Sequence, residues 1–404
     1  MPRILFCAQA AYRDGGIEAW LDALVLALQR DGWDVHVALA QGKFHRPDWY
    51  VEKHPLPNVI ALDGTRGLRE GRLLRLLEVF EATSPDVIFS VNIADALYAA
   101  AEWKRRGATA RLVTCIHGQE PGPIRDAERC AAFLDRIFSV SRRTANTLEQ
   151  TALAGRVQHI PTGVREPLQP PRVRTELRNL AYVGRLDAQK RALDLVPLAR
   201  LLDGSGITIH VAGDGPDREA IARAGVVLHG AVTPERLYED IYPNADALLI
   251  FSEKEGGPIV AWEAMIHGVV PVVSDFQGRA DEGVLRDGET ALVFPVGDVD
   301  ACAAALRRLP PLLETLSRNA MKLLPRDYHL AAFEENWSRA LRDVLSREPL
   351  RSNERVMRAV SPGWIERLGL SERATFRLRT LLGTRADPSD AGDEWPHTYS
   401  NTPR

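Results

Sequence analysis

The chain has 404 residues, 45% of them hydrophobic, with 51 basic and 54 acidic residues and a formal net charge of -3. This length allows two ordinary domains, and the charge balance excludes binding of nucleic acid through net positive charge. The four cysteines include no Cys-x-x-Cys pair, so neither a disulfide framework nor a zinc site is indicated. We find no signal peptide and no apolar run near the roughly 20 residues of a membrane helix, and therefore expect a cytoplasmic location.

The first part of the chain alternates short apolar runs with helical patterns. Residues 3–9 predict a buried parallel strand, and a turn with two glycines leads into an amphipathic helix over residues 17–30. Further strands are expected over residues 35–40, 59–62, 87–90, 111–116 and 137–140. Alternation of this kind is typical of an α/β protein with a doubly wound parallel sheet.

Three features of this part could meet a ligand. Gly15 and Gly16 follow the first strand, where the missing side chains would let the backbone approach an anion, although a plain tight turn is the alternative. His117 follows the strand over residues 111–116, and ligands of open sheets gather at the carboxyl ends of strands, although a lone histidine is usually structural. Residues 41–57, in which Gly42, Pro47, Pro55 and Pro57 break the pattern, predict a loop. Its aromatic side chains would either stack on an acceptor or cover the sheet edge.

A second alternation begins after the proline-rich stretch at residues 167–171, which suits a stiff linker. Residues 180–186 predict a strand that runs into Gly-Arg, and a helix is expected over residues 192–202. Residues 207–216 and 226–233 have the same strand-to-turn form. Arg185 offers a planar fork and Lys190 a compact charge, which together could neutralise a diphosphate. A solvated basic turn is the alternative.

The most informative stretch is residues 251–274, which predict a loop, a helix and a strand after the apolar run at residues 245–251. Pro258 stands where the first helical residue would be. Glu255 lies in the loop and Glu263 on the helix, with two glycines at positions 256 and 257 that would expose backbone amides at the helix start. Ionised carboxylates accept hydrogen bonds from hydroxyls, so this combination suits a phosphorylated sugar.

Glu255, seven intervening residues and Glu263, followed by Ala264-Met265, Gly268 and Pro271-Val-Val-Ser, resemble the signature of retaining GT-B glycosyltransferases, in particular glycosyltransferase family 4 (group 1). His117-Gly118, Gly184-Arg-Leu with Gln189-Lys190, and Pro161-x-Gly-Val match the same family, and the resemblance ends at Pro349. It implies two Rossmann-like domains with doubly wound parallel sheets that face a cleft. The expected divisions are an acceptor-side domain over residues 1–164, a nucleotide-sugar domain over 165–325, a helix returning to the first domain over 326–350, an Arg-rich helical extension over 351–385 and a disordered tail over 386–404.

The resemblance implies a retaining transfer of a hexose-type sugar from a UDP- or GDP-sugar to a glycan, lipid-linked or small-molecule acceptor, in cell-surface polysaccharide or glycoconjugate synthesis. The implied catalytic residues are His117 facing the sugar, Arg185 and Lys190 on the diphosphate, and Glu255 on the sugar hydroxyls. The implied donor-binding residues are Gly15, Gly16, Gly184, Gly213, Val232, Thr233, Gly256, Gly257, Pro258 and, at the ribose, Glu263. We expect no cofactor and no metal, and Asp298-Val-Asp300 is interpreted as the cap of a helix.

Several alternatives stay open. A GT-B phosphorylase or epimerase, or a non-catalytic nucleotide-sugar-binding protein, would share the fold. A nicotinamide enzyme is disfavoured because no Gly-x-Gly-x-x-Gly follows the first strand. The Arg-rich residues 351–385 would either contact the inner face of the membrane or cover the N-terminal domain with arginines facing water.

Overall fold

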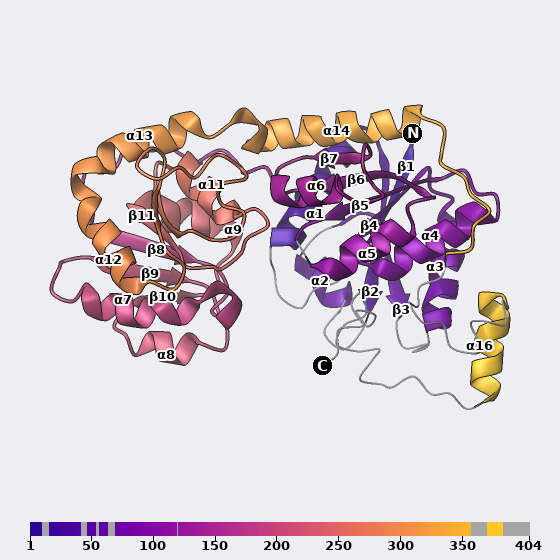
Figure 1. Ribbon diagram of the computed structural model, residues 1–404, viewed down its shortest axis with the longest axis horizontal. Helices are drawn as coiled ribbons and strands as arrows, with labels where there is room; N and C mark the ends of the chain where they lie inside the picture. The colour runs from indigo at the N-terminus through magenta and orange to yellow at the C-terminus, as the bar shows by residue number, and fades with distance from the viewer. Residues whose placement is uncertain are drawn as a thin grey trace. The chain divides into compact units, whose positions relative to one another are not determined.

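The structure is a computed structural model of the chain and describes residues 1–9, 16–41, 47–53, 56–63, 69–118, 120–356 and 370–382. Gly15 and the predicted tail over residues 386–404 lie outside these ranges. The chain forms two compact units (Figure 1). Unit 1 comprises Met1–Val140, Thr144–Ile160 and Glu334–Arg404, and unit 2 comprises Ser141–Arg143 and Pro161–Phe333. The sequence predicted the corresponding domain boundaries after residue 164 and at residue 326.

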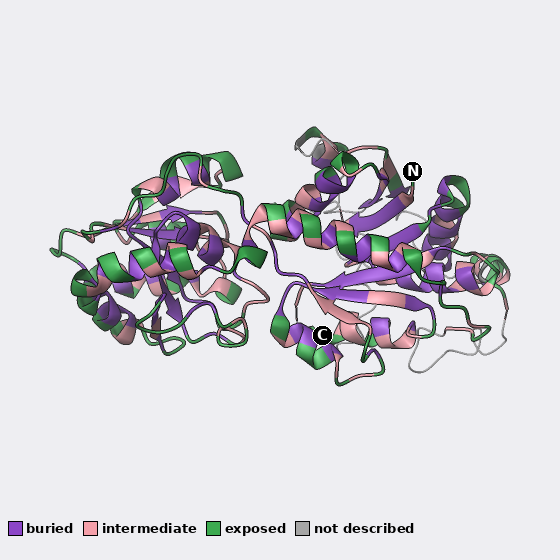
Figure 2. Ribbon diagram, turned by 90° about the horizontal axis from the view of Figure 1, so that it is seen from above, coloured by how far each residue is buried: buried purple, intermediate pink, exposed green. Residues whose placement is uncertain are grey.

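Unit 1 is built on a seven-stranded sheet in which every neighbouring pair of strands is parallel, in the order β3-β2-β1-β4-β5-β6-β7. The strands are β1 (Arg3–Gln9), β2 (Asp34–Gln41), β3 (Val59–Asp63), β4 (Val87–Val91), β5 (Arg111–Ile116), β6 (Leu134–Ser139) and β7 (Val157–His159). All five residues of β4 are buried, and the sheet is largely purple in Figure 2. Because helices cover both faces, these strands carry continuous apolar runs, which is why the sequence located them.

The helices of this part of the chain are α1 (Gly16–Arg30), α2 (Pro47–Lys53), α3 (Arg69–Thr83), α4 (Ala94–Arg105), α5 (Pro121–Arg129) and α6 (Arg142–Leu148). Residues 41–57, expected as a loop, therefore contain a helix. Tyr50 of α2 is fully buried, as expected for an aromatic residue that covers the sheet. Among the described helices, none is both long and apolar enough to cross a membrane.

Unit 2 is built on a six-stranded parallel sheet in the order β10-β9-β8-β11-β12-β13. The strands are β8 (Asn179–Val183), β9 (Thr208–Ala212), β10 (Val227–Gly230), β11 (Ala247–Ile250), β12 (Val270–Ser274) and β13 (Leu292–Phe294). The helices include α7 (Leu195–Leu201), α8 (Arg218–Ala222), α9 (Pro234–Arg236), α10 (Tyr242–Asn244), α11 (Ile259–Ile266), α12 (Val299–Arg308) and α13 (Leu313–Leu323). The predicted α/β class with two doubly wound parallel sheets is confirmed.

Two predicted helix ends can be compared directly with the structure. Asp298 caps α12, since its carboxylate accepts from the Ala301 N–H at 2.8 Å. Pro258 was expected as the first helical residue of α11, but that helix begins at Ile259 and Pro258 immediately precedes it, with ψ at 86°. The proline is therefore the residue at the N-cap of the helix rather than its first helical residue.

The boundary between Phe333 and Glu334 falls inside α14 (Leu330–Ser346). The part of α14 that belongs to unit 1 inserts Trp337, which is fully buried, with its ring 5.3 Å from Trp20 and 4.6 Å from Phe138. Asp31, after α1, accepts hydrogen bonds from the Ser338 hydroxyl and from the Arg342 guanidinium at 2.8 Å. An aromatic anchor and a polar contact therefore hold this helix on unit 1.

The described part of the Arg-rich extension includes α16 (Glu372–Leu381), which packs on α3. Arg379 lies 3.5 Å from the buried carboxylate of Glu70. At the end of the helix Leu381 and Leu382 are 84% and 56% exposed. This part of the extension thus covers unit 1, and it also presents two leucines to solvent.

Candidate donor site

The order of strands in unit 2 reverses between β8 and β11, since β8 pairs with β9 on one side and with β11 on the other. In open parallel sheets, ligands bind in the crevice that forms at such a reversal, beyond the carboxyl ends of the two strands. The loops that follow β8 and β11 are residues 184–190 and 251–258. These loops contain most of the predicted site residues of this unit.

Lys190 and Glu255 meet between these two loops. The Lys190 ammonium donates to Glu255 Oε1 at 2.7 Å, and the two side chains are 28% and 12% exposed. The buried Ser252 hydroxyl donates to the same oxygen at 2.6 Å, and the Ser274 hydroxyl donates to the Ser252 carbonyl at 2.6 Å. The predicted cation and the predicted acid are therefore in contact, and two serines fix the acid in its place.

Arg185 lies in the same turn as Lys190 but makes different contacts. Its guanidinium donates to the Gln189 side chain at 2.7 Å and lies 3.4 Å from Asp187 Oδ2, with 48% of the side chain exposed. Asp187 also caps the short turn Ala188–Lys190 by accepting from the Lys190 N–H at 3.0 Å. Arg185 is thus held by its own turn and is open to solvent.

The turns after β8 and β9 pack backbone against backbone. Gly213 has a φ of +157°, and a Cβ atom on it would lie 1.8 Å from the Gly184 carbonyl oxygen. The Gly184 N–H donates to the Ala212 carbonyl at 3.0 Å, which ties the first turn to the end of β9. Glycine is required here because any side chain would push the two turns apart.

The loop before α11 and the loop after β10 complete the predicted donor residues of unit 2. Within the described ranges, no acceptor contacts the backbone N–H groups of Gly256 and Gly257, which just precede α11. Thr233 caps α9, since its hydroxyl accepts from the Arg236 N–H at 3.4 Å, and Val232 beside it is partly buried. The Val232-Thr233 segment is two strands away from β8 in the sheet.

Glu263, on α11, is held by two tyrosines that the sequence did not single out. The Tyr242 hydroxyl donates to Glu263 Oε2 at 2.6 Å, and the Tyr238 hydroxyl lies 3.4 Å from Oε1. Burial raises the pKa of the Glu263 carboxyl to about 7, although the tyrosine hydrogen bonds oppose this rise. The tyrosines were missed because they precede Glu263 by more than 20 residues and meet it only through the tertiary fold.

The predicted residues of unit 1 are His117 and Gly16. His117 follows β5, and its ring packs edge to face on Trp20 at 4.6 Å. The buried Nε2 has no hydrogen-bond partner among the described residues, and burial lowers the pKa of the imidazole to about 4. His117 is therefore neutral at pH 7 and can exchange hydrogen bonds with a hydroxyl but cannot act as a strong acid there. Gly16 is the first residue of α1 and is exposed.

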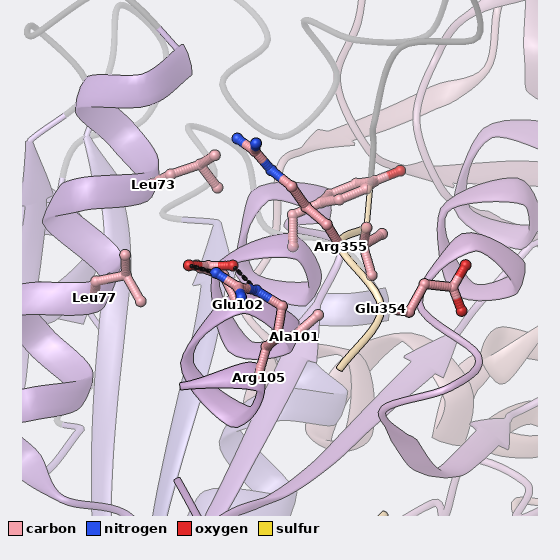
Figure 3. Close-up of a pocket in the computed structure, with 10 residues that line it drawn as sticks. Leu73, Leu77, Ala101, Glu102, Arg105, Glu354 and Arg355 are labelled. Carbon is pink, nitrogen blue, oxygen red and sulfur yellow. Dashed lines mark hydrogen bonds and ion pairs between the residues drawn. The ribbon is translucent and has the colours of Figure 1, made fainter. Parts of the chain in front are cut away.

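A separate pocket of unit 1 lies between α3 and α4, beside residues 354–356 (Figure 3). Leu73 and Leu77 form one wall, and the Arg105 guanidinium is paired with the Glu102 carboxylate through hydrogen bonds of 2.7 and 2.8 Å. None of the predicted site residues lines this pocket.

Across the described ranges, no group of three or more His, Cys, Asp or Glu side chains could hold a metal ion.

Comparison with known families bears on both units. Residues 14–166 match the family profile described as Glycosyltransferase Family 4, and residues 178–310 match the profile described as Glycosyl transferases group 1. The chain belongs to the group 1 glycosyltransferases. The two matches confirm the predicted family, glycosyltransferase family 4 (group 1), which the motifs at Lys190, Glu255 and Glu263 resemble.

The chain is 26% identical over 247 residues to the lipopolysaccharide 1,6-galactosyltransferase of Salmonella typhimurium. The matched region covers 56% of this chain and 66% of that protein. The chain spans 66% or less of the length of the curated relatives that it matches.

Among solved structures, Anabaena HepE in complex with UDP is 18% identical with a TM-score of 0.68, over 84% of this chain and 100% of that chain. The same protein in complex with UDP-glucose has a TM-score of 0.67 at 18% identity, over 85% and 100%. The sucrose-phosphate synthase of Thermosynechococcus elongatus is 18% identical with a TM-score of 0.70, over 86% and 100%. At such identities these structures show the fold alone, which is GT-B as predicted.

Proposed function

We propose that this glycosyltransferase transfers a hexose-type sugar from a UDP- or GDP-sugar to a glycan, lipid-linked or small-molecule acceptor, with retention of configuration and without a metal or other cofactor. The observation that carries the proposal is the contact of Lys190 with Glu255 at 2.7 Å, in loops that flank the strand-order reversal. The named activity of the Salmonella relative favours a role in cell-surface polysaccharide synthesis, and the HepE complexes favour a UDP-linked donor.

The proposed role of Lys190 follows from charge development during the reaction. When the bond between the sugar C1 and the diphosphate oxygen breaks, negative charge grows on the leaving phosphate, and a cation held nearby stabilises the transition state more than the ground state. An ammonium has three donors, so Lys190 can keep its bond to Glu255 while it donates to a phosphate oxygen. Arg185, which is exposed in the same turn, would supply a second cation.

Glu255 is suited to hold the hydroxyls of the transferred sugar. Lys190 and Ser252 both donate to Oε1. Within the described part of the chain no donor contacts Oε2, so this oxygen can accept from a sugar hydroxyl. The neutral imidazole of His117 would exchange a further hydrogen bond with the sugar. We assign no nucleophile to either residue. In the proposed retaining step the acceptor oxygen bonds to C1 on the face that the phosphate leaves, and the acceptor proton passes to the departing phosphate oxygen.

The remaining predicted residues would bind the nucleotide diphosphate. The turns at Gly184 and Gly213 carry no side chain that would keep a diphosphate away from the backbone. The amides of Gly256 and Gly257, with Pro258, lead into α11 and suit an anion or hydroxyl, as would the start of α1 at Gly16 and, outside the described ranges, Gly15. The proposal further places the Val232-Thr233 backbone near the base and Glu263 at the ribose.

We also propose a cytoplasmic location with contact at the inner face of the membrane, supported by the exposed Leu381 and Leu382 beside the arginines of α16. The full chain should co-sediment with vesicles that contain anionic lipid. Replacing both leucines by serine should abolish this. Sedimentation that is absent, or equal for the two proteins, would contradict the membrane contact but not the transfer activity.

The transfer activity is tested by incubating the full chain with a panel of UDP- and GDP-hexoses, with and without glycan acceptors, and measuring nucleotide release. One donor should be consumed, and Lys190→Ala and Glu255→Gln should each lower the rate by about 10²-fold or more. Arg318→Ala, in an exposed pair on α13, is the matched control and should leave the rate unchanged.

Each other outcome of this assay would indicate a different role for the protein or for its residues. Full turnover in both variants would contradict the roles of Lys190 and Glu255. Binding of a donor that is never consumed would favour a non-catalytic nucleotide-sugar-binding protein. Turnover that needs no acceptor, or that requires inorganic phosphate, would favour an epimerase or a phosphorylase.

A further inference from the structure

We infer that Tyr242 is a positioning residue that holds one oxygen of Glu263 and leaves the other for the donor ribose, so that protonation of Glu263 controls donor affinity. The inference rests on the proposed function, in which Glu263 faces the ribose. It assigns a role to two tyrosines that precede Glu263 by 25 and 21 residues in the sequence.

The two tyrosines contact Glu263 unequally. The Tyr242 hydroxyl lies 2.6 Å from Oε2, within the range of a strong O–H···O hydrogen bond. The Tyr238 hydroxyl lies 3.4 Å from Oε1, which is beyond that range. A ribose hydroxyl could therefore replace Tyr238 at Oε1 at little cost, whereas the Tyr242 bond would remain and fix the carboxylate.

Tyr242 is well anchored for this task. The side chain is fully buried, its ring packs edge to face on Tyr238 at 5.9 Å, and the His267 ring lies 5.2 Å from it. Its backbone carbonyl accepts from the buried Arg174 guanidinium at 2.9 Å. Burial raises the pKa of the Tyr242 phenol well above its ordinary range, so this hydroxyl stays protonated and donates to the carboxylate.

The backbone geometry that presents the tyrosines is unusual. Leu237–Ile241 forms a π-helical turn between α9 and α10, and Tyr238 lies within it while Tyr242 directly follows it. Single π turns interrupt a regular helix and occur frequently at functional sites. The turn therefore agrees with a role for this segment at the donor rather than in the core alone.

The charged and titratable groups around Glu263 explain why its protonation changes near neutral pH. His267 packs on both tyrosines, and because burial lowers its pKa it is neutral at pH 7. Two arginines lie at this cluster. Arg174 donates to the Tyr242 and His267 carbonyls at 2.9 and 3.1 Å, and Arg165 lies 5.3 Å from the Tyr238 ring centroid and 3.5 Å from Glu235. Burial of Glu263 outweighs these contacts and raises its pKa to about 7, so this residue is largely protonated at pH 6 and ionised at pH 8.

The test is calorimetric titration of the full chain with UDP-glucose between pH 5.5 and 8.5, a range in which the esterified diphosphate of this probe does not titrate. Hydrogen bonds to a charged acceptor are about twice as strong as those to a neutral one. The affinity should therefore rise by about 10-fold across a midpoint near pH 7, and Glu263→Gln should remove the rise. UDP-glucose that lacks the ribose 2′-hydroxyl should also bind with a flatter pH profile.

Tyr242→Phe and Tyr238→Phe form the matched pair. Without the Tyr242 bond the carboxylate is harder to ionise, so Tyr242→Phe should move the midpoint to higher pH and weaken binding at pH 7 by about 10-fold. Tyr238→Phe should change the affinity by less than about 3-fold, because its contact is long.

Two results would overturn the inference: equal effects of the two phenylalanine variants, or a flat pH profile in the wild type. The flat profile remains decisive even if Tyr242→Phe does not fold. If neither UDP-glucose nor any other UDP- or GDP-hexose binds at any pH, the proposed function fails with it, whereas pH-independent binding removes this inference alone.

Discussion

Two glutamates eight positions apart lie in different surroundings, and their chemistry depends on that difference. Glu255 accepts from an ammonium and a hydroxyl, whereas Glu263 accepts from the buried Tyr242 phenol and has the Tyr238 hydroxyl 3.4 Å away. Their spacing in the sequence located both residues because the motif is local. Tyr238 and Tyr242 could not be predicted in the same way, because they meet Glu263 only through packing between elements. Ser252 lies only three residues from Glu255, but no motif singled it out.

The raised pKa of Glu263 predicts a change in stability with pH. The folded protein holds a proton that the unfolded chain releases between pH 4.5 and about 7, so the free energy of unfolding falls as pH rises through that interval. A glutamine has no such dependence. Glu263→Gln should therefore gain up to about 3 kcal/mol relative to wild type between pH 4.5 and 8, at about 1.4 kcal/mol per pKa unit.

Denaturant unfolding of both proteins at pH 4.5, 6 and 8 measures this difference. Glu255→Gln, in the loop that precedes α11, serves as the reference for the effect of removing one carboxylate from this part of the chain. A stability difference between wild type and Glu263→Gln that stays constant with pH would contradict the raised pKa.

At the scale of elements, the strands were predictable because both faces of each sheet are covered and their apolar runs are continuous. The missed helix α2 begins at Pro47, which was interpreted as a breaker although proline is favoured at a first helical position. The helix expected over residues 192–202 is divided. Its regular part starts only at Leu195, because Pro197 has no N–H to bond to an earlier turn.

The turns after β8 and β9 give one prediction at this scale. Gly213→Ala would place a Cβ atom against the Gly184 carbonyl, and it should destabilise unit 2 by about 2–4 kcal/mol and lower donor affinity. Gly225→Ala is the control, since its φ is +77° but nothing lies within 4 Å, so it should cost only about 1 kcal/mol. Equal unfolding free energies for the two variants would show that the turns can separate freely.

The anchoring of α14 on unit 1 gives a second prediction about the elements. Trp337→Ala leaves a large cavity beside Trp20 and Phe138, and it should destabilise unit 1 by about 3–5 kcal/mol in denaturant unfolding. Arg339→Ala, on the exposed face of the same helix, should change the stability by less than about 0.5 kcal/mol. A small loss for the tryptophan variant would mean that this helix is not part of the core of unit 1.

At the scale of the whole molecule, the predicted site residues are divided between two compact units. Unit 2 supplies the contacts of Lys190, Glu255 and Glu263, and unit 1 supplies His117 and Gly16. The motifs predicted which groups belong to each unit because each group follows a strand that the sequence located. They could not predict that the second unit already has its cation and acid paired before a donor binds.

Binding of the donor at the strand-order reversal of unit 2 can be located by hydrogen–deuterium exchange of the full chain with and without saturating UDP-glucose. The donor should slow exchange in residues 184–190, 213–215 and 255–263, and the Lys190→Ala, Glu255→Gln double variant should lose this protection. Exchange in α13, which contains none of the proposed donor-binding residues, should not change. Protection that is confined to other segments, or that persists unchanged in the double variant, would contradict the account.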